Sequence, residues 1–304
     1  MIRQVDEILS LQEFTHRIGT ESQYLVQDFT GGLFHYTDLN ALISIVSTHD
    51  LWLTNSRYSN DENELKHGYK IASEVILEKR NKSPQNTFNR KYLDLVDDFL
   101  KQPPQGVYIC CFCGEDNLLS QWRSYGENGT GVSIGFNPGG FTRFTGPDIS
   151  PEQFGLMRLW KVYYDDGTKK NIIQQALELM PDLHRNESED FIARRAADAI
   201  HFFLPTFKDI DFQEENERRL IFTPSISCRI NPKYRCRKQM LVPFYSLNSL
   251  IQNENNIIER LPLINITVGP SVTKDINKES IEMMLSKSGY EGVVVKVSDT
   301  PYRG

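Results

Sequence analysis

The feature that most constrains the fold is a pair of short apolar runs that flank one predicted helix and end in polar and aromatic residues. Residues 33–38 read Leu-Phe-His-Tyr-Thr-Asp, and residues 51–55 read Leu-Trp-Leu-Thr-Asn. The apolar residues between them recur at the spacing of one helix face, and Asp38 is a typical residue for the N-terminal cap of that helix. The two polar strand ends imply a pocket at one edge of a sheet. Their hydrogen-bonding and aromatic groups suit a nucleotide-like ligand.

The rest of the chain alternates predicted helices and strands without a linker that would divide it. Residues 1–28 are predicted to form a helical arm. Residues 29–304 are predicted to form one α+β domain of catalytic type, with helical insertions at about 62–102 and 168–206. We expect a split core sheet of mixed and antiparallel strands, with strands near residues 33–36, 51–53, 107–112, 132–136, 160–164, 218–223, 241–245, 264–270 and 293–297.

Charge and cysteine content narrow the class of protein. The net charge of -6 gives no general attraction to nucleic acid or to an anionic membrane. No apolar run approaches the roughly 18 residues that span a bilayer, and no signal peptide is recognisable, so we expect a reduced, cytoplasmic protein. The cysteines are then expected to be small buried thiols, with a zinc site built from the last four as the alternative; they are Cys110, Cys111, Cys113, Cys228 and Cys236.

One basic cluster stands out against the acidic average. Such a cluster is usually a solvated loop, and the alternative is a site for a polyanion. Its members are Arg229, Lys233, Arg235, Arg237 and Lys238.

Four polar clusters lie next to predicted strands. Their candidate site residues are, in chain order, His35, Tyr36 and Thr37; Tyr58, Asn60, Asp61 and Glu64; Gln121, Trp122, Arg123 and Tyr125; and Glu215, Glu217 and Arg219. The structural alternatives are a strand end, a capped helix start, a short amphipathic helix and an exposed acidic edge, respectively. The usual sequence motifs of phosphate-cradling loops, dinucleotide-binding folds, zinc proteases and serine hydrolases are missing.

The third and fourth clusters combine groups that suit a nucleotide. Trp122, Arg123 and Tyr125 offer planar rings that stack on a base and a cation that holds a phosphate. If residues 215–219 are a strand, Glu215, Glu217 and Arg219 share one face of it. Two ionised carboxylates beside a cation can stabilise positive charge on a sugar ring while a glycosidic bond breaks.

The ordered set of motifs resembles the bacterial family called domain of unknown function 2971. The matching pieces are Phe34–Thr37, Leu51–Thr54 with Asn60, Asp61 and Glu64, Cys111-Phe112, Leu119–Gly126, Gly131–Phe136, Lys161–Tyr164, Lys208, Phe212–Arg219, Val268–Pro270, Gly289-Tyr290 and Pro301–Arg303. The resemblance covers about residues 30–303. The family label itself supplies no activity.

A second resemblance, to the ADP-ribosyltransferase fold, supplies a chemistry. It implies that His35 and Thr37 hold the adenosine ribose of NAD and that Tyr58 or Tyr36 packs on nicotinamide. It also implies that Glu217 hydrogen-bonds the nicotinamide ribose and stabilises its oxocarbenium character, while Glu215 activates the acceptor. In this chain Arg218 follows the second glutamate, where the chain's own family commonly has an aromatic residue.

We therefore expect an NAD-dependent ADP-ribosyltransferase or NAD glycohydrolase, acting as an intracellular toxin or phage-defence effector on a nucleic-acid or protein acceptor. The expectation depends on His35 and Glu217 facing one cleft. One alternative is a sensor that binds a nucleotide or a nucleic-acid end without turnover. The other is a metal-dependent nuclease that uses Asp61, Glu64 and Glu215.

Overall fold

The computed structural model describes residues 31–58, 63–85, 87–102, 106–141, 155–225, 228–237, 239–250 and 260–301, so the predicted arm at residues 1–28 lies outside the described residues. The strands are β1 (Leu33–Thr37), β2 (Trp52–Asn55), β3 (Tyr108–Phe112), β4 (Val132–Phe136), β5 (Gly155–Lys161), β6 (Arg218–Pro224), β7 (Lys233–Arg237), β8 (Met240–Ser246), β9 (Leu263–Val268) and β10 (Val294–Val297). The α-helices are α2 (Leu39–Thr48), α3 (Asn63–Lys82), α4 (Phe88–Leu100), α5 (Leu119–Ser124), α7 (Asp166–Leu183), α8 (Glu189–Phe203), α9 (Leu247–Leu250) and α10 (Lys274–Lys287).

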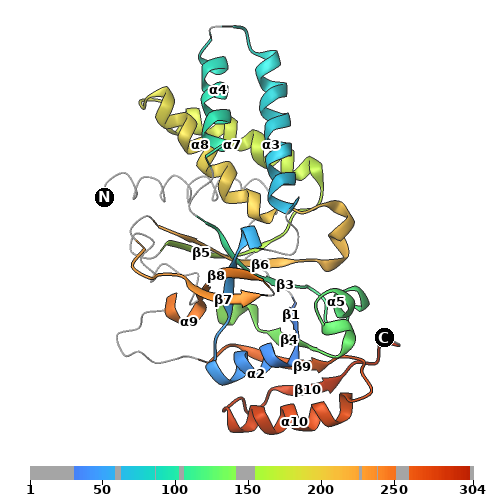
Figure 1. Ribbon diagram of the computed structural model, residues 1–304. Helices are drawn as coiled ribbons and strands as arrows, with labels where there is room; N and C mark the ends of the chain where they lie inside the picture. The colour runs from blue at the N-terminus through green and yellow to red at the C-terminus, as the bar shows by residue number, and fades with distance from the viewer. Residues whose placement is uncertain are drawn as a thin grey trace.

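The strands form two sheets that meet in the middle of the molecule (Figure 1). The four-stranded sheet has the order β1-β4-β9-β10 and is antiparallel except for the parallel pair β9 and β10. The six-stranded sheet has the order β5-β6-β3-β2-β8-β7, and its pairs are antiparallel. Phe34 and Cys113 connect the two sheets by exchanging backbone hydrogen bonds of 2.9 and 2.7 Å. The predicted α+β class with mixed and antiparallel sheets is confirmed.

Helix α2 places the ends of β1 and β2 beside each other. The Asp38 side chain caps the helix by accepting a hydrogen bond of 2.8 Å from the backbone N–H of Ala41. His49 ends it in the left-handed conformation, with φ 52°. The apolar face buries Leu42 and Val46 against the sheets, so the helix returns the chain to the same edge from which it left.

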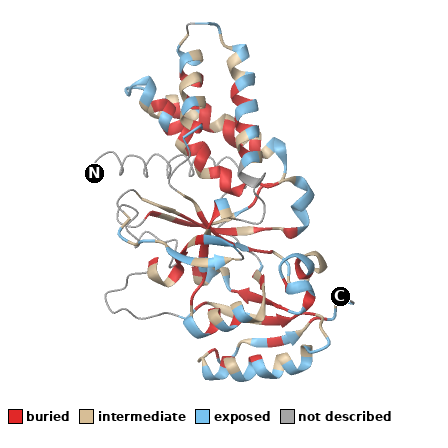
Figure 2. Cartoon of the chain, in the orientation of Figure 1, coloured by how far each residue is buried: buried red, intermediate tan, exposed pale blue. Residues whose placement is uncertain are grey.

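Helices α3, α4, α7 and α8 pack together at one end of the molecule, although they come from two separate stretches of chain (Figure 1). Thr87, Asp165 and Ser188 cap the N-termini of α4, α7 and α8 with their side-chain oxygens. The helices bury an apolar core of their own, separate from the core of the sheets, and Figure 2 shows the buried positions on their facing sides. At the opposite end, the two predicted strands near 264–270 and 293–297 are β9 and β10, and α10 connects them in a βαβ unit.

One strand prediction and one loop prediction need correction. The strand expected at 160–164 lies earlier, as β5 at Gly155–Lys161. The solvated loop expected for the basic cluster is wrong for 233–237, because this segment pairs with β8 as the edge strand β7. Backbone pairing with a neighbour decides the conformation there, and the sequence does not show it because the charged residues take the less exposed face while Tyr234 and Cys236 are exposed. No described helix is long and apolar enough to cross a bilayer.

Candidate functional site

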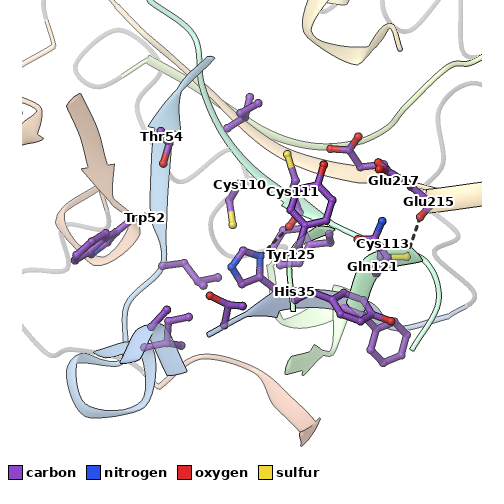
Figure 3. Close-up of a pocket in the computed structure, with 18 of the residues that line it drawn as sticks. His35, Trp52, Thr54, Cys110, Cys111, Cys113, Gln121, Tyr125, Glu215 and Glu217 are labelled. Carbon is purple, nitrogen blue, oxygen red and sulfur yellow. Dashed lines mark hydrogen bonds between the residues drawn. The ribbon is translucent and has the colours of Figure 1, made fainter. Parts of the chain in front are cut away.

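A pocket with a volume of about 310 Å³ opens where the two sheets meet (Figure 3). It receives side chains from β1, α2, β2, β3, α5 and β7 and from the segment that precedes β6. Its size falls at the lower end of typical ligand pockets, roughly 300–1,000 Å³. The predicted site residues that line it are His35, Tyr36, Thr37, Tyr58, Gln121, Tyr125, Glu215 and Glu217. His35 and Glu217 therefore share one cleft, although 182 positions separate them in sequence (217 − 35).

His35 presents a neutral imidazole to the pocket. Its Nδ1 lies 2.9 Å from the carbonyl oxygen of Cys111. Because a carbonyl only accepts, this contact assigns the proton to Nδ1 and leaves the Nε2 lone pair as an acceptor. Burial lowers the pKa of His35, and Arg235 lowers it further, whereas the hydrogen bond to Cys111 raises it. The neutral ring can accept a hydrogen bond from a ligand hydroxyl or N–H group.

The acidic end of the pocket is a cluster of four buried charges. Arg219 donates from Nε and Nη2 to the two oxygens of Glu217, each at 2.8 Å. Lys208 Nζ donates to Glu217 Oε2 at 3.0 Å and to Glu215 Oε2 at 2.5 Å. Burial by itself raises the pKa of Glu217, but Arg219 and Lys208 outweigh it and hold the pKa below its usual value. Glu217 is therefore ionised at neutral pH, and two cations balance the two carboxylates.

The backbone around this cluster differs from the prediction of one strand face. Strand β6 begins at Arg218, and Glu215 ends the 3₁₀ turn Ile210–Glu215. Asn216 turns the chain between the two glutamates in the left-handed conformation, with φ 43°. The Tyr164 hydroxyl accepts a 2.8 Å hydrogen bond from the backbone N–H of Glu217 and so fixes that residue. The two carboxylates converge on Lys208 instead of following one face of a strand.

Trp122 supports the pocket from behind and does not line it. Its ring is 0% exposed, and its Nε1 donates to Asn117 Oδ1 at 3.0 Å. The ring packs edge-on against Tyr36 with a centroid distance of 4.8 Å. The Tyr36 hydroxyl in turn accepts from the backbone N–H of Leu118 at 2.8 Å. The predicted stacking of Trp122 on a ligand has no accessible ring face, because tertiary packing places the indole in the core.

The remaining candidates divide into supporting, distant and undescribed residues. Arg219 is 2% exposed and acts on the pocket only through Glu217. Arg123 is exposed on α5 and does not line the pocket. Asn60 and Asp61 lie outside the described residues, as does the side chain of Glu64.

The structure adds cations that the sequence reasoning did not assign to the site. Lys208 lines the acidic end, and Arg235 and Arg237 line the opposite part of the pocket. Lys208 precedes the glutamates by seven and nine positions, a spacing without a recognised signal. The two arginines belonged to the predicted basic cluster, for which a polyanion site was the alternative. Trp52, 37% exposed, lies beside them on the pocket wall.

The described part of the chain offers no metal centre. No group of three or more histidine, cysteine or acidic residues is placed there to hold a metal ion. Cys110 and Cys113 are buried, as expected for small apolar groups, and burial raises the pKa of Cys110 to about 12. Cys111 and Cys236 are exposed and Cys228 is half-buried, so the expectation of buried thiols is wrong for these three residues. Cys111 lines the pocket.

With this geometry in place, one comparison with known proteins identifies a family. Residues 121–220 match the model of the family described as Protein of unknown function (DUF2971). The match confirms the predicted resemblance to this family for these residues. The matched segment runs from α5 to β6 and carries the whole four-charge cluster. Searches of curated proteins and of solved structures found no match.

Proposed function

We propose that the pocket binds NAD and that the protein is an NAD-dependent ADP-ribosyltransferase or NAD glycohydrolase. The observation that carries the proposal is the position of His35 and the ionised Glu217 on one pocket. The proposal includes an ADP-ribosyltransferase-like fold and, from the resemblance of the sequence, a role as a toxin or phage-defence effector. The acceptor would be a nucleic acid, a protein or water.

In this proposal the bond between C1′ of the nicotinamide ribose and N1 of nicotinamide breaks. Nicotinamide leaves as a neutral molecule with the electron pair, and positive charge develops on the sugar ring. An ionised carboxylate stabilises that charge. Glu217 suits this role because Arg219 and Lys208 keep it ionised and fixed in place. Oε2 of Glu217 already accepts from Arg219 and Lys208, so a ribose hydroxyl would use the second acceptor site of Oε1 or replace the hydrogen bond that the Cys111 side chain makes to this carboxylate.

The other groups take roles that their positions allow. Glu215 would take the proton of the attacking hydroxyl as the new bond to C1′ forms. Thr37 and the Nε2 atom of His35 would hydrogen-bond the adenosine ribose. Tyr58 and the partly exposed Tyr125 are the rings available to pack on nicotinamide, because the Tyr36 ring is buried and packs against Trp122.

The test is the release of nicotinamide from NAD, measured by chromatography with and without cell extract. Glu217→Gln keeps the shape of the side chain and removes its charge. We expect it to slow release by about 10²- to 10³-fold, the usual cost of losing one electrostatic contact to a transition state. Glu214→Gln is the matched control, because Glu214 is exposed on the same turn and does not line the pocket. Equal rates for wild type and Glu217→Gln would refute the proposal.

A sensor without turnover is the second candidate, and one observation favours it. Both oxygens of Glu217 already accept hydrogen bonds from Arg219, as they would in a purely structural ion pair. A sensor would bind NAD and release no nicotinamide in the same assay, whereas the enzyme does both.

A further inference from the structure

Strand β7 supplies a second charged surface to the same pocket. Its residues alternate between two faces, and Arg235 and Arg237 both line the pocket. Two residues of a strand span about 6.8 Å, so the two guanidinium groups start from neighbouring positions on one face. Lys233 precedes them on that face but does not line the pocket.

The side chain of Arg235 is held in place from two sides. Its Nη2 donates to Thr54 Oγ1 at 3.0 Å. Its guanidinium carbon lies 5.2 Å from the centroid of the Trp52 ring, which itself stacks on Phe244 at 4.4 Å. Arg237 donates from Nη1 to the backbone oxygen of Tyr58 at 3.5 Å. The side chain of Arg235 is therefore ordered before any ligand binds.

Arg235 nevertheless lacks a compensating charge. Its Nε is buried and has no hydrogen-bond partner, and it forms no ion pair with another residue of the described chain. Burial lowers the pKa of Arg235, and the neighbouring charge of Arg237 lowers it further. A partly buried guanidinium charge that has no counter-charge and lies next to a like charge is unfavourable unless an anion compensates it. This is the opposite of the acidic end, where the cations and carboxylates neutralise one another.

We propose that Arg235 and Arg237 form a subsite for the diphosphate group of a nucleotide. A guanidinium group binds two phosphate oxygens through parallel N–H donors, and two such groups on one strand face suit two linked phosphates. The inference rests on the proposed function only in taking a nucleotide as the ligand. It places the phosphates beside Arg235 and the neighbouring Trp52, so that a ribose attached to them can extend toward Glu217. Figure 3 shows His35 between Trp52 and Glu217.

The test is calorimetric binding of ADP, AMP and adenosine to the whole protein. ADP is expected to bind more tightly than AMP, and AMP more tightly than adenosine. Arg235→Gln and Arg237→Gln should each weaken ADP by about 10- to 100-fold, the range for losing a hydrogen bond to a charged group, and leave adenosine unchanged. Lys233→Gln is the matched control and should bind ADP like wild type. A thermal melt of each variant separates a binding defect from unfolding.

The outcomes distinguish this inference from the proposed function. Selective loss of ADP affinity in both arginine variants supports the subsite, whether or not nicotinamide is released from NAD. Equal binding of ADP and adenosine, or wild-type ADP affinity in both variants, overturns it. Binding of a single-stranded oligonucleotide through these arginines without binding of ADP also overturns it and assigns them to a nucleic-acid ligand.

Discussion

The two ends of the pocket carry similar residues in opposite electrostatic situations. At the acidic end, Lys208 and Arg219 are 4% and 2% exposed and pair with two glutamates. At the basic end, Arg235 has a hydroxyl and an aromatic ring as neighbours but no carboxylate in the described chain. A cluster whose charges compensate one another contributes to the stability of the fold and needs no ligand. A charge that the fold leaves uncompensated is available to a ligand, so the same type of residue serves stability at one end and binding at the other.

The largest effect that this comparison predicts is on folding, at the acidic end. Arg219→Ala removes the bidentate partner of Glu217 and leaves a buried carboxylate with only Lys208. We expect the free energy of unfolding to fall by about 3–5 kcal/mol in urea titrations, as for other broken buried ion pairs. Arg123→Ala, at an exposed position, is the control and should change it by less than about 0.5 kcal/mol. A loss below about 1 kcal/mol for Arg219→Ala would contradict the structural role of the cluster.

A smaller effect with a definite pH dependence is expected at Lys208. Lys208→Met keeps an aliphatic chain of similar length but leaves Glu215 and Glu217 close together with one cation. Their repulsion then favours the protonated form, so the variant should lose about 1.5–3 kcal/mol of unfolding free energy at pH 7.5 and clearly less at pH 4.5. Urea titrations at the two pH values measure the difference. Equal losses at both values would show that packing, not charge, explains the effect.

The sequence predicts local features, such as helices and strand ends, better than it predicts which residues come together in the pocket. Asp38 and the apolar residues after it predicted α2, and the two strand ends predicted the pocket edge, because each depends on neighbours within a few positions. The prediction that Glu215 lies on the same strand as Glu217 is wrong, because Asn216 takes the left-handed conformation between them and β6 begins only at Arg218. The burial of Trp122 depends on packing against Tyr36, which is distant in sequence.

The largest omission was strand β7 and its arginines. Its charged residues alternate with Tyr234 and Cys236, but the arginines lie on the less exposed face and these two residues are exposed, the reverse of the usual strand pattern. Pairing with β8 makes the segment a strand. Strand β8 follows β7 directly, but the pairing of β8 with β2, far earlier in the chain, is what brings β7 to the pocket, and that distant pairing cannot be read from one sequence. The sequence shows that the cluster is basic, but only the order of strands in the sheet shows that Arg235 and Arg237 face the pocket.

His35 lies between the acidic and the basic end of the pocket, and its pKa responds to the charge at the basic end. Burial lowers its pKa in the folded protein, so the unfolded chain binds more protons as the pH falls below about 6.5. The free energy of unfolding should therefore decrease as the pH falls through that value, by at most about 1.4 kcal/mol per pH unit. His35→Gln should remove this contribution to the pH dependence of the free energy of unfolding. An anion bound at Arg235 would raise the pKa of His35, so saturating ADP should reduce its contribution.

Urea titrations between pH 5.0 and 7.5 measure the His35 effect. His49→Gln is the control, because burial also lowers the pKa of His49 but its ring contacts Tyr290 and does not line the pocket. The contribution of His49 to the pH dependence of the free energy of unfolding should not change when ADP is added. An identical response of both histidines to ADP would mean that the ligand acts on global stability and not on the charge beside His35.

The smallest effect on folding is expected at the basic end and completes the comparison. Arg235→Gln removes one hydrogen bond to Thr54 and one contact with the Trp52 ring, each of which contributes roughly 1 kcal/mol or less. It also removes the repulsion with Arg237 and a buried donor that has no partner, which opposes the loss. The free energy of unfolding should therefore stay within about 1 kcal/mol of wild type when no ligand is present, and urea titration without nucleotide measures it. At an ADP concentration that saturates the wild type, the variant should gain about 1.4–2.7 kcal/mol less stability than the wild type, which is the equivalent of a 10- to 100-fold weaker affinity. A loss of several kcal/mol without ligand, comparable to that of Arg219→Ala, would mean that Arg235 belongs to the folded structure in the same way as the cations of the acidic end.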